Sequence, residues 1–205
     1  MKDTVTPNPW RSLRTHTPAR IGLGRAGISV PTAVQLDFQL AHAQARDAVL
    51  RPFDAAGVAA AIEAQGLQVL RLHSAAADRA TYLKRPDLGR RLDAASQQRL
   101  DALPPTDPPD LALVVADGLS PLAIERHAAP FTGLLRATLG PTWRWAPVTV
   151  VEQARVAVGD PIGHALGARL VVVLVGERPG LSSPDSMGLY VTWAPRPGRT
   201  DAERN

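Results

Sequence analysis

The sequence feature that most constrains the fold is a set of short apolar runs that alternate with segments of helical character. Residues 111–116 are apolar at every position, and similar runs occupy 148–151, 170–175 and 188–194. Runs of this length are typical of strands that are buried on both faces of a parallel sheet. Strands that alternate with helices therefore predict an α/β fold with a parallel, doubly wound sheet.

Proline and glycine mark where the helices begin and end. Pro31 begins the strongest expected helix, and Pro52 ends it. A second helix is expected from Asp54, a good N-cap, to Gly66. Ser120-Pro121 opens a third, which runs to about residue 138.

The remaining segments give weaker signals. Residues 1–30 carry several prolines and glycines, so they are expected to be an irregular arm. We expect a strand at 67–72, a loop at 81–88 that is followed by a polar helix to about 103, and a short helix at 162–166. Residues 156–158 are interpreted as a continuation of the strand at 148–151.

A proline-rich stretch at 104–110 suggests a division of the chain. We predict an N-terminal, mainly helical part at 1–104 and a C-terminal sheet domain at 105–205. Ligands of such sheets bind outside the carboxyl ends of the strands. In this chain those ends are Asp117-Gly118, residues 151–156 and Gly176-Glu177.

Composition excludes several classes of protein. No apolar run reaches the length of about 18 residues that spans a bilayer, and the polar start at residues 1–4 predicts no secretory signal. The chain has no cysteine, which excludes thiol chemistry and cysteine-bound zinc and suits the reducing cytosol. The formal net charge is +4, but the arginines are scattered among acidic residues. This pattern does not favour a nucleic-acid partner, and fits a partner subunit or an anionic ligand better.

Three local motifs contain residue types that occur in cofactor, metal or catalytic sites. Gly22, Gly24 and Gly27 match the dinucleotide-binding pattern, but no buried strand precedes them. Asp160 and His164 lack the spacing of a metal site and are interpreted as a capping aspartate and a surface histidine. Ser120 lacks the surroundings of a nucleophile and is expected to be an N-cap. We therefore predict no catalytic residue and no metal ligand in this chain.

The turn after the run at 170–175 is the most informative local feature. Glu177 follows the expected strand within Gly176-Glu177-Arg178-Pro179-Gly180. A carboxylate there accepts hydrogen bonds from amide or hydroxyl groups of a ligand. The alternative is a surface turn on which Arg178 neutralises the glutamate, and the spacing alone does not decide between them.

Taken together, the motifs resemble one family, the small (light) subunit of ethanolamine ammonia-lyase. The blocks that carry this resemblance keep their order from about Pro7 onward: PARIGLGR at 18–25, DRATYLKRPDLGR at 78–90, VADGLS at 115–120, GERPGL at 176–181 with Ser186, and RTDAERN at 199–205.

The resemblance implies a function for this chain. Family members use adenosylcobalamin to convert ethanolamine to acetaldehyde and ammonia. A large subunit holds the substrate in a TIM barrel and performs most of the radical chemistry. The small subunit covers the cobalamin from the other side through a Rossmann-like domain. The resemblance thus implies a Rossmann-like, mostly parallel sheet domain at 105–205, preceded by a helical arm and docking region at 1–104. By motif, its contacts fall on Val156 and Glu177 of this sequence, and a further family contact is a cysteine beyond the last block. Because the chain stops at Asn205, we expect the C-terminal part of the domain to be missing.

The expected partner is thus the large subunit, in a hetero-oligomer without nucleic acid or membrane. The expected location is the cytoplasm, where family members often lie in a bacterial microcompartment. Some cobalamin proteins bind cobalt through the histidine of a D-x-H-x-x-G loop, but here Asp160 lies four residues before His164 instead of two. We predict that no histidine of this chain binds cobalt. The alternatives are a stand-alone dinucleotide-binding oxidoreductase and an interaction module that does not bind the cofactor.

Overall fold

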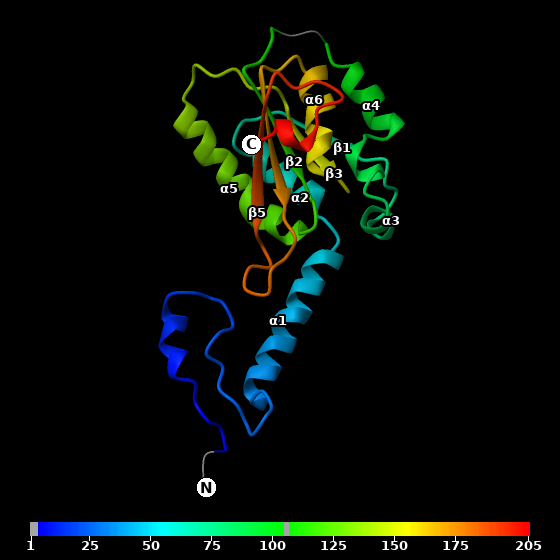
Figure 1. The fold of residues 1–205 in the computed structure, drawn as a ribbon. Helices are drawn as coiled ribbons and strands as arrows, with labels where there is room; N and C mark the ends of the chain where they lie inside the picture. Colours follow the sequence, from blue (N-terminus) through cyan, green and yellow to red (C-terminus); the bar gives the residue numbers. More distant parts are fainter. Residues whose placement is uncertain (1–3, 105–106) are drawn as a thin grey trace.

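A sheet of mixed direction forms the body of the protein in the computed structural model, which describes residues 4–104 and 107–205 (Figure 1). Its strand order is β1-β3-β2-β4-β5. The first four strands in this order are parallel, and β5 is antiparallel to β4. The strands are β1 (Val69–His73), β2 (Leu111–Ala116), β3 (Val148–Glu152), β4 (Leu170–Gly176) and β5 (Met187–Trp193). This confirms the α/β class and the mostly parallel sheet, while the closer comparison with a Rossmann fold stays a prediction.

Helices cover both faces of the sheet. On one face, α2 (Ala55–Glu63) and α5 (Pro121–Leu139) pack against β2, β3 and β4. The other face carries α4 (Ala94–Asp101) and α6 (Gly159–Ala165). The remaining helices are α1 (Thr32–Leu50) and α3 (Arg79–Lys84), with short 3-10 turns η1 (Pro9–Thr15), η2 (Leu88–Arg90), η3 (Val156–Val158) and η4 (Asp201–Glu203).

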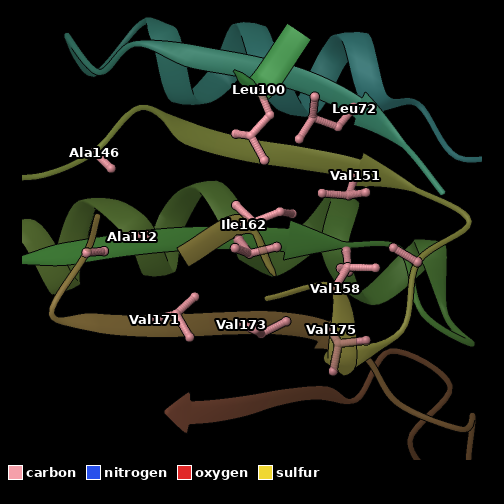
Figure 2. Close-up of a cluster of buried hydrophobic side chains, with 14 residues drawn as sticks. Leu72, Leu100, Ala112, Ala146, Val151, Val158, Ile162, Val171, Val173 and Val175 are labelled. Atoms are coloured by element: carbon pink, nitrogen blue, oxygen red, sulfur yellow. The ribbon is translucent and has the colours of Figure 1, made fainter. Parts of the chain in front are cut away.

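Alternate side chains of the strands build two apolar layers. In β2 every residue is buried, with odd positions facing α2 and α5 and even positions facing α4 and α6. Figure 2 shows the second layer, in which Ile162 of α6 lies in one cluster with Ala112 of β2, Val151 of β3 and Val173 of β4. Burial of the strands on both faces therefore explains the continuous apolar runs of the sequence, as expected.

The predicted helix starts agree with the caps that form. Ser120 Oγ accepts a hydrogen bond from Ala123 N at 3.3 Å, and Asp54 Oδ1 accepts one from Gly57 N at 2.8 Å. Two predictions were wrong. The loop expected at 81–88 begins as helix, because residues 81–84 belong to α3, at whose N-terminus the Asp78 side chain accepts a hydrogen bond from Thr81 N. Residues 156–158 form the turn η3 instead of extending β3.

Asp160 also differs from its predicted role as a cap. No side chain caps α6; Asp160 is instead buried and forms an ion pair with Arg204, which is also buried. The pair ties the last residues of the chain to α6, and Asn205 Oδ1 accepts a hydrogen bond from Val191 N of β5. His164 is exposed, as expected.

The expected division at residues 104 and 105 stays a prediction, and residues 105–106 lie outside the described part of the chain. β1 precedes this point, yet it pairs with β3 from Val69 to His73. The sheet therefore draws strands from both sides of the proline-rich stretch. Before it, residues 4–50 form an arm that ends in α1 and leads away from the sheet (Figure 1). In the described residues, no helix is both long enough and apolar enough to cross a bilayer.

Candidate functional site

The strand order brings three sequence-predicted strand ends to one edge of the sheet. β2 lies between β3 and β4, so the segments that follow these strands are neighbours at their carboxyl ends. Asp117 Oδ1 accepts a hydrogen bond from Ala154 N at 2.9 Å, and Gly176 O accepts one from Leu119 N at 2.7 Å. We name this region, residues 117–120, 153–156 and 176–177, the carboxyl edge.

Gly118 allows two of these segments to touch. Its φ is +57°, and a Cβ at this position would collide with the carbonyl oxygen of Gly176. Only glycine adopts this conformation without strain and also leaves room for the neighbouring backbone. The Asp117-Gly118 turn is therefore shaped for close contact with the end of β4.

Asp117 is the buried centre of the carboxyl edge. It is fully buried, and its Oδ2 pairs with Arg79 Nη1 at 3.2 Å. Burial raises the pKa of Asp117 to about 6, although the hydrogen bond from Ala154 N and the charge of Arg79 oppose that rise. Burial likewise lowers the pKa of Arg79, with Asp117 opposing. The two groups thus form a buried ion pair that fixes α3 against the end of β2.

The loop after β3 is held in an unusual backbone conformation. Gln153 has φ +54°, a left-handed value that is uncommon for a residue with a side chain. Ser74 Oγ donates a hydrogen bond to Gln153 O at 2.6 Å, and Arg79 Nη1 also reaches Gln153 Oε1 at 3.4 Å. These contacts stabilise the turn that presents residues 154–156. Strained positions of this kind cluster at functional sites, so the loop is a candidate for a functional role.

Tyr82 packs beneath this loop and carries two guanidinium groups on its ring. The Cζ atoms of Arg79 and Arg155 each lie 4.8 Å from the ring centroid, a distance typical of cation–π contact. The phenol is buried and donates a long hydrogen bond to Ala154 O at 3.4 Å. Burial raises the pKa of Tyr82 to about 12, so the phenol stays neutral.

Glu177 lies at the end of β4, as the sequence predicts. It is half-buried, and its Oε1 accepts a hydrogen bond from the Tyr190 hydroxyl at 2.8 Å. This contact raises the pKa of Tyr190. Gly188 of β5 makes room for the carboxylate, because a Cβ there would collide with Glu177 Oε1. Arg178 is exposed and forms no ion pair with Glu177 within the described residues, which argues against the neutralised surface turn.

Val156, the other predicted contact residue, begins η3 just beyond the Gln153 turn. It is half-buried and packs against the apolar layer of α4 and α6. Val156 and Glu177 therefore follow β3 and β4 on either side of the Asp117 turn. The carboxyl edge offers a ligand an apolar contact and a carboxylate acceptor.

Sequence reasoning about single motifs missed Arg79, Tyr82 and Arg155. The signal for Arg79 and Tyr82 was present in the block at residues 78–90, where Asp78 is a good N-cap and Tyr82 is the aromatic residue of the helix that follows. Arg155 has no local signal, because its partner Tyr82 is distant in sequence.

The two other motifs do not assemble into sites of chemistry. Ser120 is buried, caps α5 and donates a hydrogen bond to Pro184 O at 2.8 Å. In the loop at 22–27, a Cβ at Gly22 or Gly24 would press against backbone of residues 6–11, and α1 begins only at Thr32. This loop lacks the strand before it and the helix after it that dinucleotide binding requires.

The fold and the carboxyl edge define a class, the α/β proteins that present polar and apolar side chains where their parallel strands end. The sequence places the chain within that class. Residues 7–205 match the family described as ethanolamine ammonia-lyase light chain (EutC), and the chain belongs to this family.

Curated relatives agree over almost the whole chain. A protein of Ralstonia nicotianae is 62% identical over 205 residues, which cover 98% of this chain and 76% of the relative. One from Pseudomonas aeruginosa is 59% identical over 208 residues, covering 100% and 76%. One from Pseudomonas syringae pv. tomato is 57% identical over 209 residues, covering 100% and 73%. Each is named ethanolamine ammonia-lyase small subunit.

Proposed function

We propose that this chain is the small subunit of an adenosylcobalamin-dependent ethanolamine ammonia-lyase and helps to bind the cobalamin at its interface with a large catalytic subunit. The observation that carries the proposal is the carboxyl edge. There, the two residues matched by family motif, Val156 and Glu177, flank the buried Asp117 turn. The names of the relatives support the lyase and a second, larger subunit.

The residues at this edge fit a cobalamin. A corrin has an apolar face and a rim of amides, which suits a valine beside a carboxylate acceptor. Glu177 uses Oε1 for Tyr190, and no residue in the described ranges donates a hydrogen bond to Oε2. Val156 would contact the corrin, and Glu177 would accept a hydrogen bond from an amide or hydroxyl group.

When bound, adenosylcobalamin supplies a cobalt–carbon bond whose homolysis begins radical chemistry. This chain's own contribution is to bind, to orient and to keep water from the covered side of the cofactor. We assign the reaction of ethanolamine to the large subunit, so the small subunit is not expected to catalyse alone. We propose that the assembly is located in the cytoplasm, where a bacterial microcompartment can enclose it.

The exposed apolar side chains of the arm support the proposal that this chain has a large protein partner. Large apolar side chains that stay exposed come mainly from residues before Leu50: Trp10, Leu13, Ile28, Val30, Leu36, Leu40. A concentration of large exposed apolar side chains in one segment suits a protein interface. We propose that this arm docks on the large subunit.

Co-expression with the matching large subunit tests the proposal. Size exclusion should show one complex, and that complex should release acetaldehyde and ammonia from ethanolamine only after adenosylcobalamin is added. Failure to form a complex would contradict the proposal. Binding of a nicotinamide dinucleotide by this chain alone, lost on substitution of Gly24, would instead support the oxidoreductase alternative.

A further inference from the structure

Arg155 is a half-buried cation whose guanidinium has no polar partner among the described residues. Its Nε is buried and unbonded, and nothing in residues 4–104 and 107–205 forms a hydrogen bond or an ion pair with its guanidinium. The guanidinium lies on the face of the Tyr82 ring, with Cζ 4.8 Å from the ring centroid. A guanidinium carries five N–H donors, and partial removal from water without an acceptor is unfavourable.

The charged neighbours of Arg155 are already engaged. Asp117 is taken by Arg79 and by the backbone of Ala154. Arg79 lies on the same tyrosine ring, and the charge of Arg155 helps to lower the pKa of Arg79 after the larger effect of burial. Glu177 bonds to Tyr190 and lies beyond ion-pair distance of both arginines. Since no carboxylate of the described residues forms an ion pair with Arg155, the repulsion between Arg155 and Arg79 is not offset at Arg155.

The geometry suits an anion from a ligand. The planar fork of arginine binds phosphate with two parallel hydrogen bonds, and stacking on Tyr82 fixes the plane of the fork beforehand. Arg155 also immediately precedes Val156, the proposed corrin contact. An anion bound here would belong to the molecule that touches Val156 and Glu177.

We propose that Arg155 binds the phosphodiester of the cobalamin nucleotide loop. The corrin ring itself carries neutral amides on its rim, so this phosphodiester is the anionic group that the cofactor offers. The inference rests on the proposed function, because it assumes that cobalamin is the ligand of the carboxyl edge.

Three probes separate the phosphate from the rest of the cofactor. Cobalamin has both the phosphodiester and the nucleotide base, cobinamide phosphate has a phosphate without the base, and cobinamide has neither. Binding of each is measured by absorbance titration of the assembled complex with the large subunit. The variants are Arg155→Gln and Arg155→Lys. The matched control is Arg178→Gln, because Arg178 is an exposed arginine two residues beyond the last residue of β4.

The expected result is selective. Arg155→Gln should weaken cobalamin and cobinamide phosphate by roughly 10- to 100-fold and leave cobinamide unchanged, because a charge-assisted hydrogen bond is lost. Arg155→Lys should give an intermediate loss, and Arg178→Gln none. Equal weakening of all three probes, or weakening of cobalamin alone, would overturn the proposal, since the residue would then support the loop or contact the base.

Two further measurements keep the test decisive. If Arg155→Gln does not assemble, the loss in Arg155→Lys is compared across the same three probes. If the wild-type complex binds none of the probes, the proposed function itself fails. If it binds them and the phosphate makes no difference to either variant, only the role of Arg155 fails.

Discussion

The arm and the sheet of this protein distribute their apolar side chains in opposite ways. In the sheet, apolar residues from both faces of β2 lie in closed layers, and Ile162 is fully buried. In the arm, α1 buries only Ala41 and Ala48, while Leu36 and Leu40 are 58% and 60% exposed. The difference indicates that the sheet is stabilised by its own packing, whereas the arm needs another surface to bury its apolar residues.

The largest effect should come from a cavity in the sheet core. Ile162→Ala is expected to lower the free energy of unfolding by about 2–5 kcal/mol, because it removes buried methyl groups between α6 and the sheet. Leu36→Ala in the arm is the matched control, with a change within about 0.5 kcal/mol. Denaturant unfolding of the purified chain measures both. Similar losses in the two variants would contradict the comparison.

The next effect is a pH dependence that arises at the carboxyl edge. The pKa of Asp117 is about 6 in the folded chain and about 3.9 in an unfolded one. Between these values the folded chain holds a proton that the unfolded chain has released, so raising the pH favours unfolding. From about pH 3 to about pH 8, the stability of the wild type relative to Asp117→Asn should fall by about 3 kcal/mol.

Unfolding curves of both proteins across that range check this sign. The comparison with Asp117→Asn removes the opposite contribution of carboxylates such as Asp185, whose pKa is lowered by its hydrogen bond from Arg126. A difference that stays constant with pH, or that grows in favour of the wild type, would refute the assignment of Asp117 as the buried carboxyl.

A smaller effect is expected on cofactor affinity. Glu177→Ala should weaken adenosylcobalamin binding by the assembled enzyme by about 1–3 kcal/mol, because a half-buried acceptor is lost. Glu177→Gln keeps an acceptor oxygen and should recover part of that affinity. Equilibrium titration gives the values, and an unchanged affinity in Glu177→Ala would remove this residue from the site.

The smallest effect concerns the contact between arm and sheet domain. Arg20 donates hydrogen bonds of 3.3 Å to Leu181 O and Ser182 Oγ. These bonds lie near the surface, so Arg20→Ala should change the free energy of unfolding by about 1 kcal/mol or less. Hydrogen exchange at residues 180–183 should nevertheless rise. No change in exchange would show that the contact does not fix the arm.

Much of the sheet could be predicted from the sequence, because burial on both faces leaves a direct mark on composition. The run at 111–116 coincides with β2. The antiparallel direction of β5 also has a sequence cause. The ten residues between Gly176 and Met187 contain no helix, and a parallel connection needs a longer crossover.

Other features depend on residues that are far apart in the chain. α3 is six residues long and is stabilised by the burial of Tyr82 beneath the loop after β3, which no local pattern reveals. The sequence predicts a capping role for Asp160 because its buried partner, Arg204, is 44 residues away. At the site, strand ends predicted Asp117 and Glu177, whereas the arginines on Tyr82 required the folded structure.

The central claim is that this chain completes a cobalamin site at the carboxyl edge of its sheet. The most direct test is an equilibrium titration of adenosylcobalamin into the matching large subunit, with and without this chain. We expect an affinity at least roughly tenfold higher in the complex, since Glu177 and Arg155 add polar contacts. Equal affinity in the two titrations would contradict it.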